Sequence, residues 1–352
     1  MSARSPADTR ATGARGTQRR DTVLDLARFV SALAVLSFHH FFWGPLWEPG
    51  SQRYGWAPAV TRYGFLGVEV FFLISGFVIL TSWERRPPLV FLRARFARLF
   101  PAWVVTVGLL GAVLLVREGV SRGLLARVAA NLTMFHWVAG VPDLDAVYWS
   151  LAVEIRFYLF MVVIGVLVAR RRLMAVLAVW LGVSLVSFWV RLPSGVVTML
   201  NLRWAPLFVG GMAFADLRER GSKPWHAPLL AVAFLGSFAA SRHHAGEVSK
   251  TTGLVHMNPW VVLAVVFGAY ALFALVTVGT FDRVQVRAFT VLGAMSYPLY
   301  LVHQEIGFIG QAHLFTVPAP VAEVLVVAAV LAFAWVVQAW VEPPLRRRLA
   351  PS

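Results

Sequence analysis

Long apolar segments separated by short polar loops run through almost the whole chain. About 20 consecutive, mostly apolar residues are enough for an α-helix to cross the hydrocarbon core of a bilayer. The pattern therefore predicts an all-α fold, a polytopic bundle of about ten transmembrane helices. The predicted spans are residues 24–44, 62–82, 99–116, 151–169, 173–190, 199–217, 227–241, 259–278, 288–310 and 319–341.

The composition and the placement of charge support a membrane protein and predict its orientation. Hydrophobic residues make up 59 % of the 352 residues and charged residues only 14 %, whereas about a quarter of the residues in a soluble domain are charged. The net charge of +15 does not indicate nucleic-acid binding, because the basic residues form short clusters between apolar segments. With the N-terminus inside, the inner segments carry 21 of the 32 Lys and Arg residues and the outer segments carry 8. This bias predicts a multi-pass protein of the cell membrane with both termini inside.

The chain is expected to form one membrane domain with short tails. Residues 1–20 are small, polar and Arg-rich, which is typical of a disordered cytoplasmic tail. The membrane domain is expected at 21–348 and a C-terminal tail at 349–352. The longest outer loop, 118–148, has an amphipathic centre that should lie at the interface or dip into the mouth of a cavity.

Two polar residues inside the first predicted span point to such a cavity. Arg28 and His39 are eleven residues apart, which in an α-helix is three turns plus about 20° and about 16 Å of rise. Both side chains therefore share one stripe, while His40 points about 120° away from Arg28. A cation and an imidazole on one stripe of a membrane helix are costly in lipid, so the stripe should border a polar cavity.

Other ionisable residues lie at a similar depth, near the outer ends of their predicted spans. These residues are Glu69, Glu154, Arg156, Arg203 and His303. The two arginines can also be explained as side chains that extend to the interface, and Glu69 and His303 as purely structural groups. A neutral imidazole with a carboxylate partner can take a proton from a hydroxyl, so His39 is the candidate general base. The remaining histidines are expected to be ordinary interface or loop residues.

The absence of some residue types and motifs narrows the chemistry. The chain has no cysteine, which excludes disulfides, thiolate metal ligands and a cysteine nucleophile. The sequence also lacks an H-E-x-x-H motif, a glycine-rich phosphate loop and a G-x-S-x-G elbow. We therefore expect no metal site and no permanently bound cofactor.

Six elements in order resemble the acyltransferase 3 family, whose members are integral-membrane acyltransferases. They are Arg28-x10-His39, GFLGVEVFFLISGF at 64–77, RFARLFP at 95–101, WSLAVEIRFYL at 149–159, GAMSYPLYLVH at 293–303 and Glu342-Pro343. The second element usually has Asp where this chain has Glu69. The resemblance implies transfer of an acyl group, by default acetyl, from cytoplasmic acyl-CoA as co-substrate. The implied acceptor is a hydroxyl of a saccharide, a lipid-linked glycan or a natural-product glycoside.

The resemblance also implies roles for individual residues. His39 would be the catalytic base, Glu154 the other essential group and Arg28 an aid to donor binding or site organisation. Arg95 and Arg98 could hold the CoA phosphates together with Arg28. Our hypothesis is that Glu154 orients the His39 imidazole, with direct transfer and an acyl-histidine relay both open. Further residues expected to line the site are Glu69, Trp149, Ser150, Arg156, Arg203, Tyr297 and His303.

Two other protein classes could place polar residues in this way. Membrane-bound O-acyltransferases also use a buried histidine, but here the key histidine is in the first helix, three turns from its arginine. A transporter or flippase could carry the same charges along a substrate path, although no internal repeat is visible in the sequence. Release of free CoA would separate an acyltransferase from a transporter.

Overall fold

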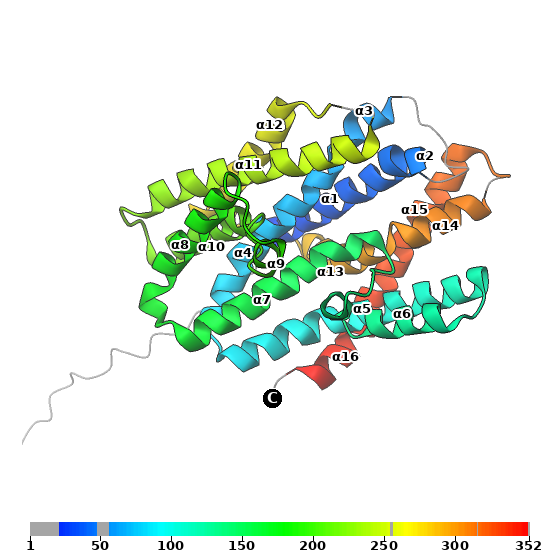
Figure 1. The fold of residues 1–352 in the computed structure, drawn as a ribbon, viewed down its shortest axis with the longest axis horizontal. Helices are drawn as coiled ribbons and strands as arrows, with labels where there is room; N and C mark the ends of the chain where they lie inside the picture. Colours follow the sequence, from blue (N-terminus) through cyan, green and yellow to red (C-terminus); the bar gives the residue numbers. More distant parts are fainter. Residues whose placement is uncertain (1–20, 48–55, 254–255, 315, 351–352) are drawn as a thin grey trace, which may run out of the picture.

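A computed structural model describes residues 21–47, 56–253, 256–314 and 316–350 of the chain. All regular secondary structure within these ranges is helical (Figure 1), which confirms the predicted all-α class. The predicted disordered tail, residues 1–20, lies outside the described residues, as do the last two residues of the predicted C-terminal tail.

The structure has a helix at each of the ten predicted spans, together with short connecting helices. The helices are α1 (Thr22–Phe38), α2 (Gly44–Trp47), α3 (Ala57–Thr61), α4 (Gly67–Glu84), α5 (Pro88–Glu118), α6 (Arg122–Leu132), α7 (Trp149–Leu167), α8 (Leu173–Ser187), α9 (Ser194–Met199), α10 (Ala205–Arg220), α11 (His226–Thr252), α12 (Pro259–Thr277), α13 (Arg287–Val302), α14 (Glu305–His313), α15 (Ala319–Val336) and α16 (Glu342–Leu349). Two π-helical turns, His39–Trp43 and Val337–Val341, connect α1 to α2 and α15 to α16.

Among the described residues, six helical stretches are long and apolar enough to cross a membrane. They are Thr22–Leu46, Ala57–Glu84, Pro88–Glu118, Ala146–Leu167, Pro259–Thr277 and Ala319–Leu349. Each coincides with a predicted span, so the membrane character of the chain is supported by its helices as well as by its composition.

Four predicted spans differ clearly from the observed helices. The span 199–217 corresponds to α10, which begins at Ala205. Helix α5 starts at Pro88, eleven residues before the predicted boundary at 99, because its first turns contain the arginines that lowered the apolar signal. Helix α11 extends to Thr252 instead of 241, because its second half is rich in small and polar residues. The span 288–310 is two helices, α13 and α14, separated at His303 and Gln304.

The centre of the bundle contains close helix contacts made by glycine. Helices α4 and α10 approach each other at Gly76 and Gly211. A Cβ atom at Gly76 would overlap the carbonyl oxygen of Phe208, and one at Gly211 would overlap that of Leu73. Small residues of this kind allow the backbones of membrane helices to touch. This glycine seam between α4 and α10 positions α4, which forms one wall of the candidate site.

One end of the bundle is held together by ion pairs between loops and helix ends. Arg218 binds Asp21 at 3.1 Å and Asp282 at 2.7 Å. Arg220 binds Glu84 at 2.7 Å. These residues all belong to the side that the sequence assigns to the cytoplasm, and we call this side the charged end.

The loop 118–148 folds back into the bundle. Helix α6 runs antiparallel along α5 (Figure 1), and the Trp103 indole donates a hydrogen bond to the carbonyl of Asn131 at 2.8 Å. Trp103 lies fifteen residues before the end of α5, or about 22 Å along the helix. The segment therefore packs along α5, and no residue of 118–148 lines either of the two cavities described below.

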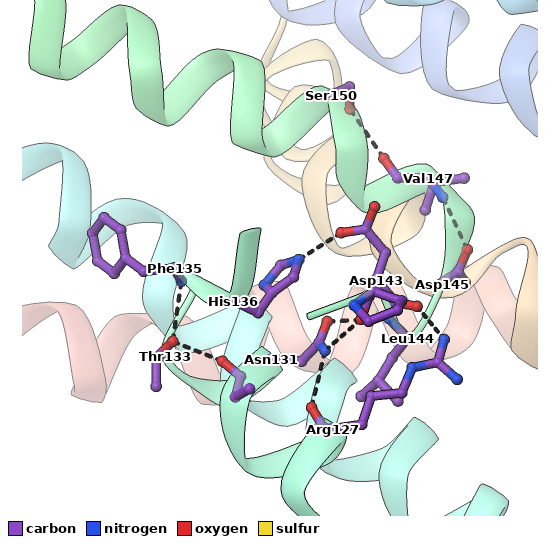
Figure 2. A network of polar contacts seen from close by, with 12 residues as sticks. Arg127, Asn131, Thr133, Phe135, His136, Asp143, Leu144, Asp145, Val147 and Ser150 are labelled. Carbon is purple, nitrogen blue, oxygen red and sulfur yellow. Dashed lines mark hydrogen bonds and ion pairs between the residues drawn. The ribbon is translucent and has the colours of Figure 1, made fainter. Parts of the chain in front are cut away.

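Polar side chains satisfy the backbone of this re-entrant segment (Figure 2). The Asn131 amide donates to the carbonyls of Arg127 and Pro142 at 2.9 and 3.1 Å, and its oxygen accepts from Leu144 N–H at 3.1 Å. His136 pairs with Asp143, which follows it across the turn. Irregular backbone at membrane depth requires such partners because lipid offers none.

Candidate active site

A cavity of about 80 Å³ lies between α1, α4, α5, α7 and α13. Its wall includes six of the residues predicted to form the site, namely Arg28, Arg95, Arg98, Glu154, Ser150 and Tyr297. A second cavity of about 340 Å³ shares Arg28, Arg95 and Arg98 as wall residues and extends to Asp21 and Arg85 at the charged end. The two cavities together outline a path from the charged end into the bundle, and we call the inner one the arginine cavity.

Positive charge dominates the wall that the two cavities share. Arg28 is 3.8 Å from Asp25, and Arg95 donates to the Ser82 hydroxyl at 3.0 Å. Arg98 is close enough to Arg28 for electrostatic repulsion between the two guanidinium groups. Three guanidinium groups on one wall favour a bound anion, and their planar donors match the geometry of phosphate oxygens.

Glu154 lies among these arginines and does not contact His39. Its carboxylate accepts hydrogen bonds from the Ser75 hydroxyl at 3.2 Å and from the Tyr158 hydroxyl one turn further along α7. Among the described residues, the hydrogen bonds of His39 go elsewhere. The expectation that Glu154 orients the imidazole was therefore wrong for this conformation, because Tyr158 and Ser75 already bind the carboxylate.

The ring partner of His39 is a second histidine. His39 Nδ1 is 2.9 Å from His303 Nε2 and 3.0 Å from the carbonyl oxygen of Val35. His303 Nδ1 is 2.8 Å from the carbonyl oxygen of Tyr300. Arg28 and His39 thus remain on one helix as predicted, but the base candidate is held by α13 rather than by a carboxylate of α7.

These contacts determine where the hydrogens lie on the two rings. A carbonyl oxygen only accepts, so His303 Nδ1 carries its hydrogen and Nε2 has the lone pair. Both partners of His39 Nδ1 are then acceptors, so Nδ1 carries hydrogen and Nε2 is unprotonated. Nε2 has no partner among the described residues, and the His39 side chain is only partly buried. This tautomer is the one that a general base at Nε2 requires.

Tyr300 connects the histidine pair to the arginine cavity. Its side chain lines that cavity, its carbonyl binds His303, and its ring centroid is 5.6 Å from that of His303. Its hydroxyl accepts from Ser150 at 2.8 Å. The Phe71 ring, 5.8 Å from the Tyr300 ring, lines the cavity beside it. His39 and His303 are absent from the cavity wall, so the site has two parts that meet at Tyr300.

Two other predicted site residues, Glu69 and Trp149, belong to a third cluster. Glu69 is buried, and its carboxylate is 2.8 Å from Nδ1 of His244. The His244 ring lies edge-on to the rings of Phe65, Trp149 and Trp204, with centroids 4.9 to 5.7 Å apart. The structural reading of Glu69 as a paired, buried carboxylate matches these contacts.

Of the two arginines for which extension to the interface was an alternative, Arg156 is held inside the protein. Its Nε donates to Asn201 at 3.1 Å, and its guanidinium lies 5.1 Å from the centroid of the Trp137 ring. Neither Arg156 nor Arg203 lines the arginine cavity.

Three histidines expected to be ordinary interface or loop residues pair with carboxylates: His136 with Asp143, His244 with Glu69 and His40 with Glu323. His40 is the most buried of them. It was expected to be an ordinary interface histidine, yet it is 1 % exposed and pairs with Glu323 at 2.8 Å. Glu323 lies in an otherwise apolar stretch of the last predicted span, which is a signal for a functional or paired carboxylate. Within the described parts of the chain, no group of three His, Asp or Glu side chains is arranged to hold a metal ion.

Asp145 connects the re-entrant segment to the start of α14. Its carboxylate accepts from the N–H of Val147 at 3.1 Å (Figure 2) and from the N–H of Glu305 at 3.0 Å, two residues after His303. One buried side chain thus caps the short 3-10 helix Ala146–Tyr148 that precedes α7 and the start of α14. Burial raises the pKa of Asp145 to about 7, although both N–H bonds favour the ionised form.

Comparison with known proteins identifies the family. A family model described as an acyltransferase domain matches residues 21–339, nearly the whole chain. The chain belongs to the acyltransferase 3 family. The family match covers both the arginine cavity and the histidine pair, and it agrees with the resemblance found in the sequence motifs.

Individual relatives match over shorter regions. The chain is 28 % identical over 155 residues to nodulation protein 10 of Rhizobium leguminosarum bv. viciae, covering 38 % of this chain and 41 % of that protein. It is 29 % identical over 156 residues to the peptidoglycan O-acetyltransferase OatA of Listeria monocytogenes, covering 39 % and 22 %. Protein 2 in the picA locus of Rhizobium radiobacter is 33 % identical over 99 residues, covering 26 % and 45 %. The chain thus spans less than half the length of each relative, and no solved structure matches it.

Proposed function

We propose that this protein is a multi-pass O-acyltransferase of the cell membrane, with both termini in the cytoplasm. It would transfer an acyl group, by default acetyl, from acyl-CoA to a hydroxyl of a saccharide, a lipid-linked glycan or a glycoside. The observation that carries the proposal is the pairing of an arginine-walled cavity with a histidine whose Nε2 is unprotonated and has no partner among the described residues. The similarity to a peptidoglycan O-acetyltransferase favours a glycan acceptor.

Donor binding is assigned to the arginine cavity. CoA carries several negative charges at one end and the reactive thioester at the other. The phosphates enter from the charged end and bind Arg95 and Arg98, with Arg28 deeper in the same wall. The pantetheine arm then extends into the arginine cavity, which places the thioester near Glu154 and Tyr300. CoA is a co-substrate that leaves after each turnover.

Transfer is assigned to His39. Nε2 takes the proton of the acceptor hydroxyl while the hydroxyl oxygen attacks the thioester carbonyl carbon. The carbon–sulfur bond breaks, the CoA thiolate leaves, and the imidazolium returns its proton to that sulfur. Tyr300 and Phe71 stand where the cavity ends, so the acyl group must pass them to meet the acceptor.

Release of CoA tests the proposal and separates it from a transporter. Purified protein in proteoliposomes receives radiolabelled acetyl-CoA and a panel of glycan fragments and glycosides, and free thiol and labelled product are measured. We expect acceptor-dependent thiol release in the wild type and none above background in His39→Ala, with both proteins folded. Transport of a glycoside without thiol release would contradict the proposal. A stoichiometric burst of thiol without acceptor would indicate an acyl-histidine intermediate.

A further inference from the structure

A chain of hydrogen bonds starts at His39 and continues behind it through His303 and His40 to Glu323. His40 Nδ1 is 2.8 Å from the carboxylate of Glu323, and His40 Nε2 is 2.7 Å from the carbonyl oxygen of His303. His303 and His40 are 0 % and 1 % exposed, and Glu323 is 4 % exposed. The Gln311 amide donates to the second oxygen of Glu323. Three side chains, those of His40, Glu323 on α15 and Gln311 on α14, thus form a network that reaches His303 through His40.

His39 and His40 are the first two residues of the π-helical turn His39–Trp43, and both contact His303. In a regular α-helix, neighbouring side chains point 100° apart. Here His39 contacts the ring of His303, and His40 contacts the backbone carbonyl of the same residue. Single π-turns are rare and occur often at functional sites.

Helix α14 is shaped to admit the His40 ring. A Cβ atom at Gly307 would lie 2.6 Å from His40 Nε2 and 2.8 Å from Cε1. The ring is held on its other sides by Glu323 and by His303, so it has no room to withdraw. Glycine at this position therefore permits a contact that any larger residue would disrupt.

The positions of the protons determine which group donates each of these hydrogen bonds. Because His40 Nε2 faces a carbonyl, it donates a hydrogen bond to His303. On the other side of the ring, His40 Nδ1 faces the carboxylate of Glu323 at 2.8 Å. The backbone of His303 is thereby fixed at the point where α13 ends, and its ring presents the Nε2 lone pair to His39.

We propose that His303 is the positioning residue for the base His39, and that the His40–Glu323 pair holds His303 in place. This inference rests on the proposed function of His39. When His39 takes the acceptor proton, its Nδ1–H already points at His303 Nε2, so the imidazolium gains a hydrogen-bond acceptor in place of the carboxylate of a conventional triad. Glu154 remains among the arginines, where its contacts place it.

The test compares His303→Leu, which removes the acceptor, with His303→Gln, which can place an oxygen near the position of Nε2. Acetyl transfer by the full chain in proteoliposomes is measured against pH, with kcat and the KM for acetyl-CoA. We expect His303→Leu to lower kcat about 10- to 100-fold, the range for a hydrogen bond to a charged group, with KM changed less than about twofold. The acid limb of its kcat profile should move to lower pH, because the imidazolium has lost an acceptor. His303→Gln should recover most of both changes.

The groups that can affect this pH profile come from every neighbouring element. They are His40 on the same π-turn, Glu323 on α15 and, through the backbone of Glu305, Asp145 before α7. Glu323→Gln and Gly307→Ala should each lower kcat less than His303→Leu, since they act on His303 indirectly.

His226 provides a matched control. It is a buried histidine paired with Asp216 at 3.1 Å near the charged end, and it has no contact with the site. His226→Gln should leave kcat and its pH profile unchanged. Equal losses in His303→Leu and His303→Gln with an unmoved acid limb would overturn the proposal. So would full activity of His303→Leu together with an inactive His39→Ala, a result that leaves the proposed function intact. If His303→Leu does not fold, His303→Gln and Gly307→Ala decide by the same pH criterion.

Discussion

The two parts of the site differ in how they use polar residues. The arginine cavity has about 80 Å³ of space, and three guanidinium groups form part of its wall. Around His39, by contrast, nearly every polar atom already has a partner, and neither His39 nor His303 lines the cavity. Positive charge beside open space suits a ligand that arrives and leaves, whereas a filled hydrogen-bond network holds one geometry. The comparison teaches that donor binding and proton transfer can be altered separately.

The largest effect is expected from a substitution of Glu154. It tests whether Glu154 belongs to the arginine cavity alone or also takes part in the transfer step. Glu154→Gln should lower kcat about 100-fold, because the carboxylate that holds the Tyr158 hydroxyl beside the thioester is lost. The KM for acetyl-CoA should stay constant or fall, since the cavity becomes more positive. Steady-state kinetics in proteoliposomes measure both constants. A large rise in KM with an unchanged kcat would place Glu154 in donor binding alone.

A smaller effect is expected from the arginines. Arg98→Gln should raise the KM for acetyl-CoA about 10-fold and change kcat little, because one charge-assisted hydrogen bond to the donor is lost. Raising the salt concentration should increase the wild-type KM in the same direction. Arg203→Gln is the matched control, since Arg203 does not line the arginine cavity. If both variants behave alike, the cavity does not bind the anionic end of the donor.

The smallest effect on catalysis is expected at Asp145, which touches neither part directly. Asp145→Asn leaves one side-chain oxygen for two backbone N–H groups, so it should lower the free energy of unfolding by about 1–3 kcal/mol. Activity should fall only a few-fold, through looser placement of α14 behind His303. Thermal unfolding in detergent and the transfer assay measure the two effects. An unchanged Tm would show that the double cap is unimportant.

The sequence could predict the helices and the arginine part of the site because both depend on local pattern. Apolar length identified the helices, and the motif around Arg95 and Arg98 placed two cations one helical turn apart. The partner of His39 was not predictable in this way. His303 lies 264 residues after His39 in the chain. In addition, a π-turn changes which of the two adjacent histidines faces which neighbour, without altering the hydrophobic pattern.

The same reasoning explains the errors in α11 and α13. The second half of α11 packs through small and polar residues, so hydropathy ended the helix too early. The helix break at His303 and Gln304 contains no proline or glycine, so the local sequence does not predict it. Both features depend on tertiary contacts, and the carboxylate of Glu323 in an apolar span was the one available sign of the network behind His39.

The glycine seam between α4 and α10 limits how the protein can accept a bulkier acyl group. Where two backbones touch, no side chain remains that could rearrange to let them slide or part. Helices α4 and α10 therefore form a rigid pair. Any widening has to come from the opposite side of the cavity, where α5 packs against both α6 and α7.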